Sequence, residues 1–145
     1  MAKALYTAEA TITGGRAAGR GVTSDGRLDL QLRLPTEMGG NGDGTNPEQL
    51  FAIGYAACLE SALGVIGRRE QAEVGDVSIT SRVSLLPTGD GRFTLAVELN
   101  VGLPHVAELE LAKRLVAGAH EICPYSNATR GNIELTLTAN GEPLP

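Results

Sequence analysis

A long apolar segment in the middle of the chain most constrains its fold. The start of this segment carries helix signals, because Asn46 can cap a helix, Pro47 suits the first helical position and Gln49 is placed for a capping box. We therefore predict one helix over residues 46–69. No face of this helix carries a charge over residues 50–59, which predicts that it is buried on all sides.

Alternating apolar and polar residues predict strands on both sides of this helix. The alternating segments are residues 5–13, 28–34, 77–85, 93–101 and 133–137. Turn residues at 87–91 predict a hairpin between the third and fourth of these strands. The strands should therefore form a mainly antiparallel sheet.

A second helix is predicted over about residues 106–122, and it should be amphipathic. Its apolar face would carry Leu109, Ala112, Val116, Ala119 and Cys123, and Pro124 should end it. The order of elements is then strands, long helix, hairpin, second helix and last strand. This order indicates an α+β fold and differs from the strict alternation of a parallel α/β sheet.

Length and charge narrow the function classes. A chain of 145 residues fits a single domain over residues 1–145. The net charge of -5 gives no electrostatic reason to expect nucleic acid or an anionic membrane as a partner. The N-terminal residues lack the apolar stretch of a signal peptide, and no window approaches the length of an uncharged membrane span. We therefore expect a cytoplasmic protein.

The two cysteines are the main candidates for chemistry. Cys58 lies in the apolar segment and Cys123 follows the second helix, so only the fold can bring them together. Cytosolic thiols are kept reduced, which favours a transient disulfide over a permanent one. Taken alone, Cys58 is as easily explained as a small buried core residue.

Helix geometry limits what can activate Cys58. The thiol would lie about three turns beyond Pro47, and the charge of a helix N-terminus fades within one turn, so a nearby cation would have to lower its pKa. Glu48 would lie on the order of 15 Å from Cys58 along the helix axis at about 1.5 Å per residue. A site that holds both residues would need another segment or another chain.

Other candidate sites are weak. The glycine-rich loop over residues 39–45 precedes a helix, but it lacks the lysine and the spacing of a phosphate-binding loop. His105 and His120 lie too far apart in sequence for a His-Glu-x-x-His zinc site, so neither a metal nor a cofactor is expected. A pairing of the His120 imidazole with the Cys123 thiol remains open.

Four segments together carry a recognisable pattern: Thr13–Arg16, Gly44–Phe51, Gly54–Cys58 and His120–Asn132, the last of which contains Cys-Pro-Tyr-Ser-Asn-Ala-Thr-Arg-Gly-Asn. The pattern resembles the organic hydroperoxide resistance proteins of the osmotically inducible protein C superfamily. The resemblance implies an intertwined homodimer and a thiol-dependent peroxidase for alkyl and fatty-acid hydroperoxides. It also implies that Cys58 attacks the peroxide, that Cys123 resolves the product as a disulfide, and that Arg16 and Glu48 stabilise the thiolate.

Further expectations rest on the same resemblance. The reductant would be a dithiol, typically a dihydrolipoyl group or a lipoylated protein. Phe51, Tyr55 and Leu59 would surround Cys58 with apolar side chains that bind the substrate's hydrocarbon, although each could equally be core packing. Arg20 lies close enough in sequence to compete with Arg16.

Two other readings of the chain remain open. In the first, the thiol pair forms a redox sensor or a small-molecule binding protein that does not turn over. In the second, the protein is a structural dimer whose cysteines merely pack.

Overall fold

A computed structural model describes residues 2–145, and these fall into two compact units, each of which is described by itself. The first unit ends at Leu50 and the second begins at Phe51. Helix α2 (Pro47–Arg69) starts in the first unit and continues into the second. The single-domain expectation stays a prediction.

The first unit is a three-stranded antiparallel sheet in the order β1-β2-β3. Its elements are β1 (Ala10–Thr13), the one-turn helix α1 (Gly15–Ala18), β2 (Gly19–Thr23), β3 (Asp29–Leu32) and the 3-10 turn η1 (Thr36–Met38). Helix α1 connects the first two strands tightly. Gly14, which precedes it, has φ of 80°, and a Cβ there would lie 2.5 Å from the carbonyl oxygen of Ala18. Only glycine fits this position, which starts the turn that carries Arg16.

In the first unit, one predicted strand is shorter than expected and one strand was not predicted. The strand predicted over residues 5–13 pairs only from Ala10 onwards. Strand β2 was not predicted, because glycines are depleted in strands and Gly19 and Gly21 break the apolar alternation. In the sheet, a Cβ on Gly19 would collide with the backbone oxygen of Gly15, whereas one on Gly21 would meet only the mobile end of the Ile12 side chain.

The start of α2 follows the sequence signals in part. The side-chain Oδ1 of Asn46 accepts a 2.9 Å hydrogen bond from the backbone N–H of Gln49, so the predicted N-cap is confirmed. The capping box is wrong, because the Gln49 side chain accepts a 2.8 Å bond from the Thr45 hydroxyl instead of returning to Asn46. Thr45 is itself held by a bridge to Leu32.

The prediction that α2 is buried on all sides is wrong. Tyr55, Leu59 and Leu63 on one side of the helix are almost fully buried, whereas Ile53 is 71% exposed. The second unit packs against one face of α2 and leaves an apolar face open. The absence of charge therefore does not report burial within one chain.

Helix α2 is long and apolar enough to cross a membrane by length and composition, with a mean hydropathy of 1.7. The expectation that no uncharged window approaches the length of a span is not contradicted, because Glu60 interrupts the uncharged run in this helix. A third of this apolar window is buried inside the structure, and length and composition alone do not distinguish a membrane span from a core helix.

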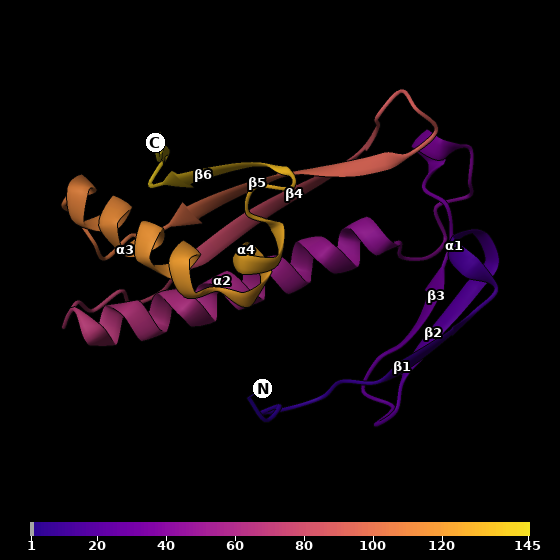
Figure 1. The fold of residues 1–145 in the computed structure, drawn as a ribbon, viewed down its shortest axis with the longest axis horizontal. Helices are drawn as coiled ribbons and strands as arrows, with labels where there is room; N and C mark the ends of the chain where they lie inside the picture. Colours follow the sequence, from indigo (N-terminus) through magenta and orange to yellow (C-terminus); the bar gives the residue numbers. More distant parts are fainter. Residues whose placement is uncertain (1) are drawn as a thin grey trace. The chain divides into compact units, whose positions relative to one another are not determined.

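The second unit is a four-stranded sheet in the order β4-β5-β6-β7, with α2 and α3 packed against it (Figure 1). Its elements are β4 (Ser78–Pro87), β5 (Phe93–Gly102), α3 (Leu109–Ile122), α4 (Pro124–Thr129), β6 (Glu134–Ala139) and β7 (Glu142–Pro143). Strands β5 and β6 pair in parallel, and the α3–α4 segment supplies the crossover connection that parallel strands require. The other pairs are antiparallel, so the mainly antiparallel prediction is confirmed, with two sheets instead of one.

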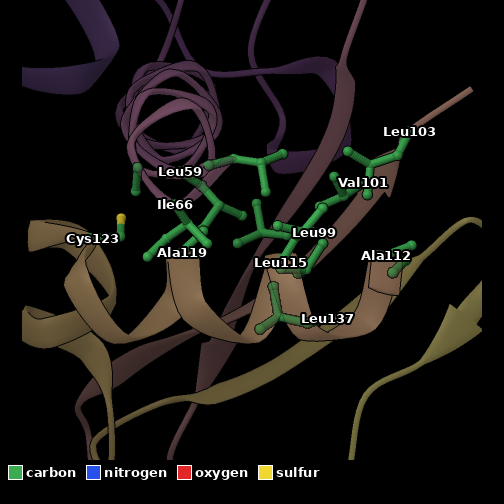
Figure 2. Close-up of a cluster of buried hydrophobic side chains, with 14 of the residues drawn as sticks. Leu59, Ile66, Leu99, Val101, Leu103, Ala112, Leu115, Ala119, Cys123 and Leu137 are labelled. Carbon is green, nitrogen blue, oxygen red and sulfur yellow. The ribbon is translucent and has the colours of Figure 1, made fainter. Parts of the chain in front are cut away.

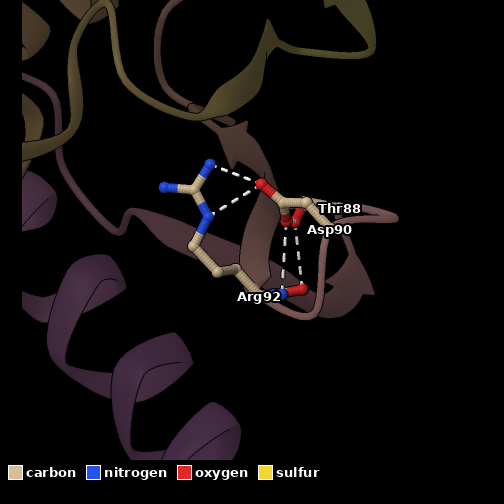
Figure 3. Close-up of polar contacts among 3 residues, drawn as sticks. All are labelled: Thr88, Asp90 and Arg92. Atoms are coloured by element: carbon tan, nitrogen blue, oxygen red, sulfur yellow. Dashed lines mark hydrogen bonds and ion pairs between the residues drawn. The ribbon is translucent and has the colours of Figure 1, made fainter.

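Strands β4 and β5 form the predicted hairpin, in register from Ser78 with Gly102 to Pro87 with Phe93. Figure 3 shows how its turn is closed by Asp90, whose carboxylate accepts bonds from the Arg92 guanidinium and the Thr88 hydroxyl. The bond from Arg92 is the main cause that lowers the pKa of Asp90 to about 2, and Thr88 contributes less.

The core of the second unit lies between the sheet and the two helices (Figure 2). Alternate residues of β5 point into it, and α2 and α3 each contribute one face. The central side chains are Leu59, Leu63, Ile66, Val97, Leu99, Val101, Leu115, Val116, Ala119 and Leu137. Cys123 lies at the edge of this cluster, beyond Ala119. The predicted apolar face of α3 is thus confirmed for Ala112, Val116, Ala119 and Cys123, whereas Leu109 is only half-buried.

The ends of α3 differ slightly from the prediction. The helix begins at Leu109, three residues later than expected, because Val106 is buried in the preceding loop. Pro124 ends α3 as predicted but also starts α4, since proline suits a first helical position. Cys123 is therefore the single residue between two helices.

Candidate active site

The two sulfurs lie together in the second unit. Cys58 comes from the middle of α2 and Cys123 from the junction of α3 and α4, and their Sγ atoms are 3.4 Å apart. Both are free thiols; Cys123 is fully buried and Cys58 is partly accessible. A disulfide has an S–S length of about 2.05 Å, so the sulfurs need to approach by about 1.4 Å to form one.

The surroundings of Cys58 in the second unit oppose its ionisation. Burial is the main cause that raises the pKa of the Cys58 thiol, and the neighbouring Cys123 raises it further. The backbone N–H of Tyr125 acts in the opposite direction, because it stabilises the thiolate. A thiolate at neutral pH would thus need a positive charge beyond these groups.

The first unit holds a preformed guanidinium–carboxylate pair. Arg16, on α1, donates from Nη2 to Oε1 of Glu48 at 3.0 Å and from Nη1 to Oε2 at 3.4 Å, and Glu48 lies in the first turn of α2. This two-point contact fixes the plane of the guanidinium, which a lysine could not provide. Arg20, the other predicted candidate, donates to Asp29 at 2.9 and 2.7 Å on the exposed side of the sheet. That Arg16 acts on Cys58 stays a prediction.

Aromatic rings gather one turn before Cys58. The ring of Phe51 lies 6.0 Å from that of Tyr55 and 5.8 Å from that of Tyr125. Tyr55 and Leu59, both predicted to bind substrate, are fully buried, whereas Phe51 and Tyr125 are partly exposed. Tyr55 and Leu59 thus form part of the core, and the more accessible rings are those of Phe51 and Tyr125. That Phe51, Tyr55 and Leu59 bind the substrate stays a prediction. Tyr125 lies in the motif that follows Cys123, but nothing in its spacing predicted a contact with Phe51, which it reaches only through the fold.

Hydrogen-bonded polar side chains lie around Cys123, where α3 ends and α4 begins. His120 lies with Nδ1 2.8 Å from the Ser126 hydroxyl, so its polar partner is this serine and not the Cys123 thiol that the sequence suggested. The Ser126 hydroxyl in turn lies 2.9 Å from the hydroxyl of Tyr55. Serine and threonine are too common for sequence alone to single these residues out.

Residues 2–145 hold no cluster of three or more side chains suited to a metal ion. The glycine-rich loop before α2 is tied by backbone bonds, with the Thr45 N–H donating to Gln31 and the Arg33 N–H donating to Thr45. The site is thus built from thiols, an ion pair, aromatic rings and hydroxyls.

Known proteins share both the sequence and the fold. Residues 40–138 match the family described as OsmC-like protein. An organic hydroperoxide resistance protein of Xanthomonas axonopodis pv. citri is 52% identical over 140 residues, which is 94% of this chain and 95% of the relative.

Solved structures of similar proteins have the same fold. The crystal structure of a Vibrio cholerae protein described in the same terms, with captopril in one of its active sites, has a TM-score of 0.92 at 42% identity. That comparison covers 98% of this chain and 96% of the other. An organic hydroperoxide resistance protein of Legionella pneumophila has a TM-score of 0.88 at 50% identity, covering 93% of this chain and 97% of the other. The chain therefore belongs to the OsmC-like family, within the group of the organic hydroperoxide resistance proteins.

Proposed function

We propose that the protein is a thiol-dependent peroxidase that reduces organic hydroperoxides to alcohols. The observation that carries the proposal is the 3.4 Å separation of the Cys58 and Cys123 sulfurs, with the first partly accessible and the second buried behind it. The accessible sulfur can meet a peroxide, and the buried one lies close enough to react with its oxidised form. The names of the curated relatives supply the substrate class.

The chemistry runs in three balanced steps. The Cys58 thiolate attacks the terminal peroxide oxygen, the O–O bond breaks, the alkoxide takes up a proton to leave as an alcohol, and Cys58 becomes a sulfenic acid. The Cys123 thiol condenses with this sulfenic acid, which forms the S–S bond and releases water. A dithiol then reduces the disulfide by thiol exchange and leaves as its own disulfide.

Arg16 would supply the positive charge that Cys58 lacks within the second unit, and Glu48 would hold its guanidinium in place. Helix geometry argues that Glu48 cannot reach Cys58 of its own helix. The proposal therefore includes an intertwined homodimer in which one chain gives the ion pair and the other gives the thiols. The exposed apolar residue Ile53 on α2 supports an interface there.

The substrate preference follows from the side chains near Cys58. Phe51 and Tyr125 present partly exposed rings, so burial of an alkyl chain favours organic hydroperoxides over hydrogen peroxide. For the reductant we propose a dihydrolipoyl group, acting in the cytoplasm. The captopril found in an active site of the Vibrio cholerae relative is itself a thiol compound, which supports access of a small thiol to this kind of site.

The test starts from the reduced protein and one equivalent of tert-butyl hydroperoxide. Mass spectrometry of the digested product should find Cys58 linked to Cys123 and one equivalent of tert-butanol released. The Cys123→Ser variant should instead accumulate the Cys58 sulfenic acid, trapped as its dimedone adduct. Absence of the linkage in the wild-type protein, with Cys58 unmodified, would refute the peroxidase mechanism.

Turnover separates the peroxidase from a redox sensor. With excess hydroperoxide and dihydrolipoamide, a peroxidase consumes many equivalents of peroxide per chain, whereas a sensor stops after one. The matched control is Cys58→Ser, which keeps the shape of the side chain and should consume none.

A further inference from the structure

Four hydroxyl and imidazole groups form a continuous hydrogen-bond network beside the sulfurs, buried except at the half-exposed His120. His120 Nδ1 lies 2.8 Å from Ser126 Oγ, and this oxygen lies 2.9 Å from the Tyr55 hydroxyl. The Tyr55 hydroxyl lies 3.2 Å from Thr129 Oγ1, which donates to the backbone oxygen of Tyr125 at 3.0 Å. Tyr55 and Ser126 are fully excluded from solvent and Thr129 is 8% exposed, so the protein itself must satisfy these groups.

If all of these bonds form at once, counting hydrogens sets the direction of each one. A carbonyl oxygen can only accept, so the Thr129 hydrogen is used on Tyr125 and Thr129 must accept from Tyr55. The Tyr55 hydrogen is then used, so Ser126 must donate to Tyr55. The Ser126 hydrogen is used in turn, and the bond to Ser126 can form only if His120 donates from Nδ1.

The opposite tautomer has one hydrogen bond fewer. With the hydrogen of neutral His120 on Nε2, the hydroxyl bonds would reverse, so that Thr129 donates to Tyr55, Tyr55 to Ser126 and Ser126 to Nδ1. The bond from Thr129 to the Tyr125 carbonyl would then be lost, at a cost of about 1 kcal/mol. The network therefore favours the Nδ1–H tautomer of His120.

The hydrogen-bond network also joins the helices that carry the two cysteines. Tyr55 precedes Cys58 by one turn of α2, His120 lies in the last turn of α3, and Ser126 and Thr129 lie on α4. Cys123 is the residue between α3 and α4, and the Tyr125 backbone at the end of the chain also interacts with Cys58. Loss of any hydrogen bond in this side-chain network would loosen the α3–α4 junction relative to α2.

We propose that this network holds His120 as its Nδ1–H tautomer and that Tyr55, Ser126, Thr129 and His120 are positioning residues for disulfide formation. They act through the Cys123 junction and not on the peroxide. The inference about disulfide formation rests on the proposed peroxidase function, whereas the inference about the tautomer does not. His120 also lines a groove of about 540 Å³ with Arg130, so the network ends at a surface that solvent reaches.

The tautomer is tested by nitrogen–proton correlation spectra of the reduced, ¹⁵N-labelled protein at about pH 8, where a histidine of ordinary pKa is neutral. A His105→Asn variant assigns the second ring. Nδ1 of His120 should give the signal of a protonated ring nitrogen and Nε2 that of an unprotonated one. The opposite pattern, or a mixture of tautomers, would overturn the proposal.

The positioning role is tested with paired threonine variants. Thr129→Val removes one hydroxyl of the chain, and Thr138→Val removes a partly buried hydroxyl on β6 that bonds to Asn100. After one equivalent of tert-butyl hydroperoxide, Thr129→Val should lose the Cys58 thiol at the wild-type rate. It should form the disulfide about tenfold more slowly, as expected for one lost hydrogen bond of about 1.4 kcal/mol. With a second equivalent of the hydroperoxide, more Cys58 should reach the sulfinic acid than in the wild type.

Tyr55→Phe should repeat the Thr129→Val result, because it removes the hydroxyl and keeps the aromatic ring. The His120→Asn variant, whose amide can donate near the Nδ1 position, should form the disulfide faster than His120→Leu. Equal disulfide rates in the Thr129→Val and Thr138→Val variants, or equal slowing of both chemical steps, would overturn the positioning role. A wild-type protein that forms no disulfide would instead refute the peroxidase function, and the tautomer result would stand.

Discussion

Cys58 is surrounded in its own unit by groups that raise its pKa, so its reactivity depends on charge from elsewhere. If Arg16 supplies that charge, Arg16→Gln should raise the pKa of Cys58, because the thiolate loses its cation. Arg20→Gln is the matched control, since Arg20 is bonded to Asp29 at the exposed side of the sheet. Thiolate absorbance near 240 nm, titrated in a Cys123→Ser background, measures the pKa. Indistinguishable titrations of the two arginine variants would rule out Arg16 as the activating cation.

His120 makes stability depend on pH. Burial is the main cause that lowers its pKa, Arg130 lowers it further, and Glu121 partly opposes them. The unfolded chain therefore takes up the proton first as the pH falls below about 6.5, so the free energy of unfolding is full above that pH and decreases below it. Urea midpoints measured from about pH 7.5 to about pH 5 should fall less in His120→Asn than in the wild type. Parallel slopes would contradict this assignment.

The N-terminus of α2 offers a test at the level of a single element. The Asn46 side chain satisfies the Gln49 N–H, so Asn46→Ala should lower the free energy of unfolding by about 1 kcal/mol. Asn46→Asp keeps an acceptor oxygen and should stay close to the wild type. Chemical denaturation at fixed pH compares them, and equal losses in both variants would show that the cap does not matter.

The elements that could be predicted are those whose signals are local. Caps and turn residues placed α2 and the β4–β5 hairpin, and apolar spacing placed the buried face of α3. Strand β2 was missed because Gly19 is required by the close approach of the Gly15 carbonyl, and because Gly19 and Gly21 both interrupt the apolar alternation that predicts a strand. The second role of Pro124 escaped because a proline that stops one helix is equally suited to start another.

At the scale of the whole molecule, the site depends on contacts between distant segments, and periodicity does not report these. The resemblance named Cys58 and Cys123, but Ser126 and Thr129 become visible only once α4 is packed beside Tyr55. The exposure of Ile53 was also hidden, because an uncharged helix reads the same whether its own chain or another copy covers it. Whether a second copy of the chain covers Ile53 is therefore a question about the proposed homodimer.

If the ion pair and the thiols of one site come from different chains, two inactive variants should rescue each other. Cys58→Ser lacks the nucleophile but keeps the Arg16–Glu48 pair, whereas Glu48→Ala keeps both thiols but loses the carboxylate that holds Arg16. In a heterodimer, one of the two sites then combines an intact Cys58 with an intact Glu48. Co-expressed chains with two different affinity tags, purified through both, should recover up to about half of the wild-type activity with tert-butyl hydroperoxide and dihydrolipoamide.

The controls for this rescue are set by the same geometry. Each homodimer, purified in the same way, gives the background, and a doubly tagged wild-type protein gives the upper value. A heterodimer of wild-type chain with the double variant Cys58→Ser, Glu48→Ala has no shared site with both residues intact, so it should be nearly inactive. If each site were built within one chain, this second heterodimer would be half active and the first inactive, which would exclude the intertwined arrangement.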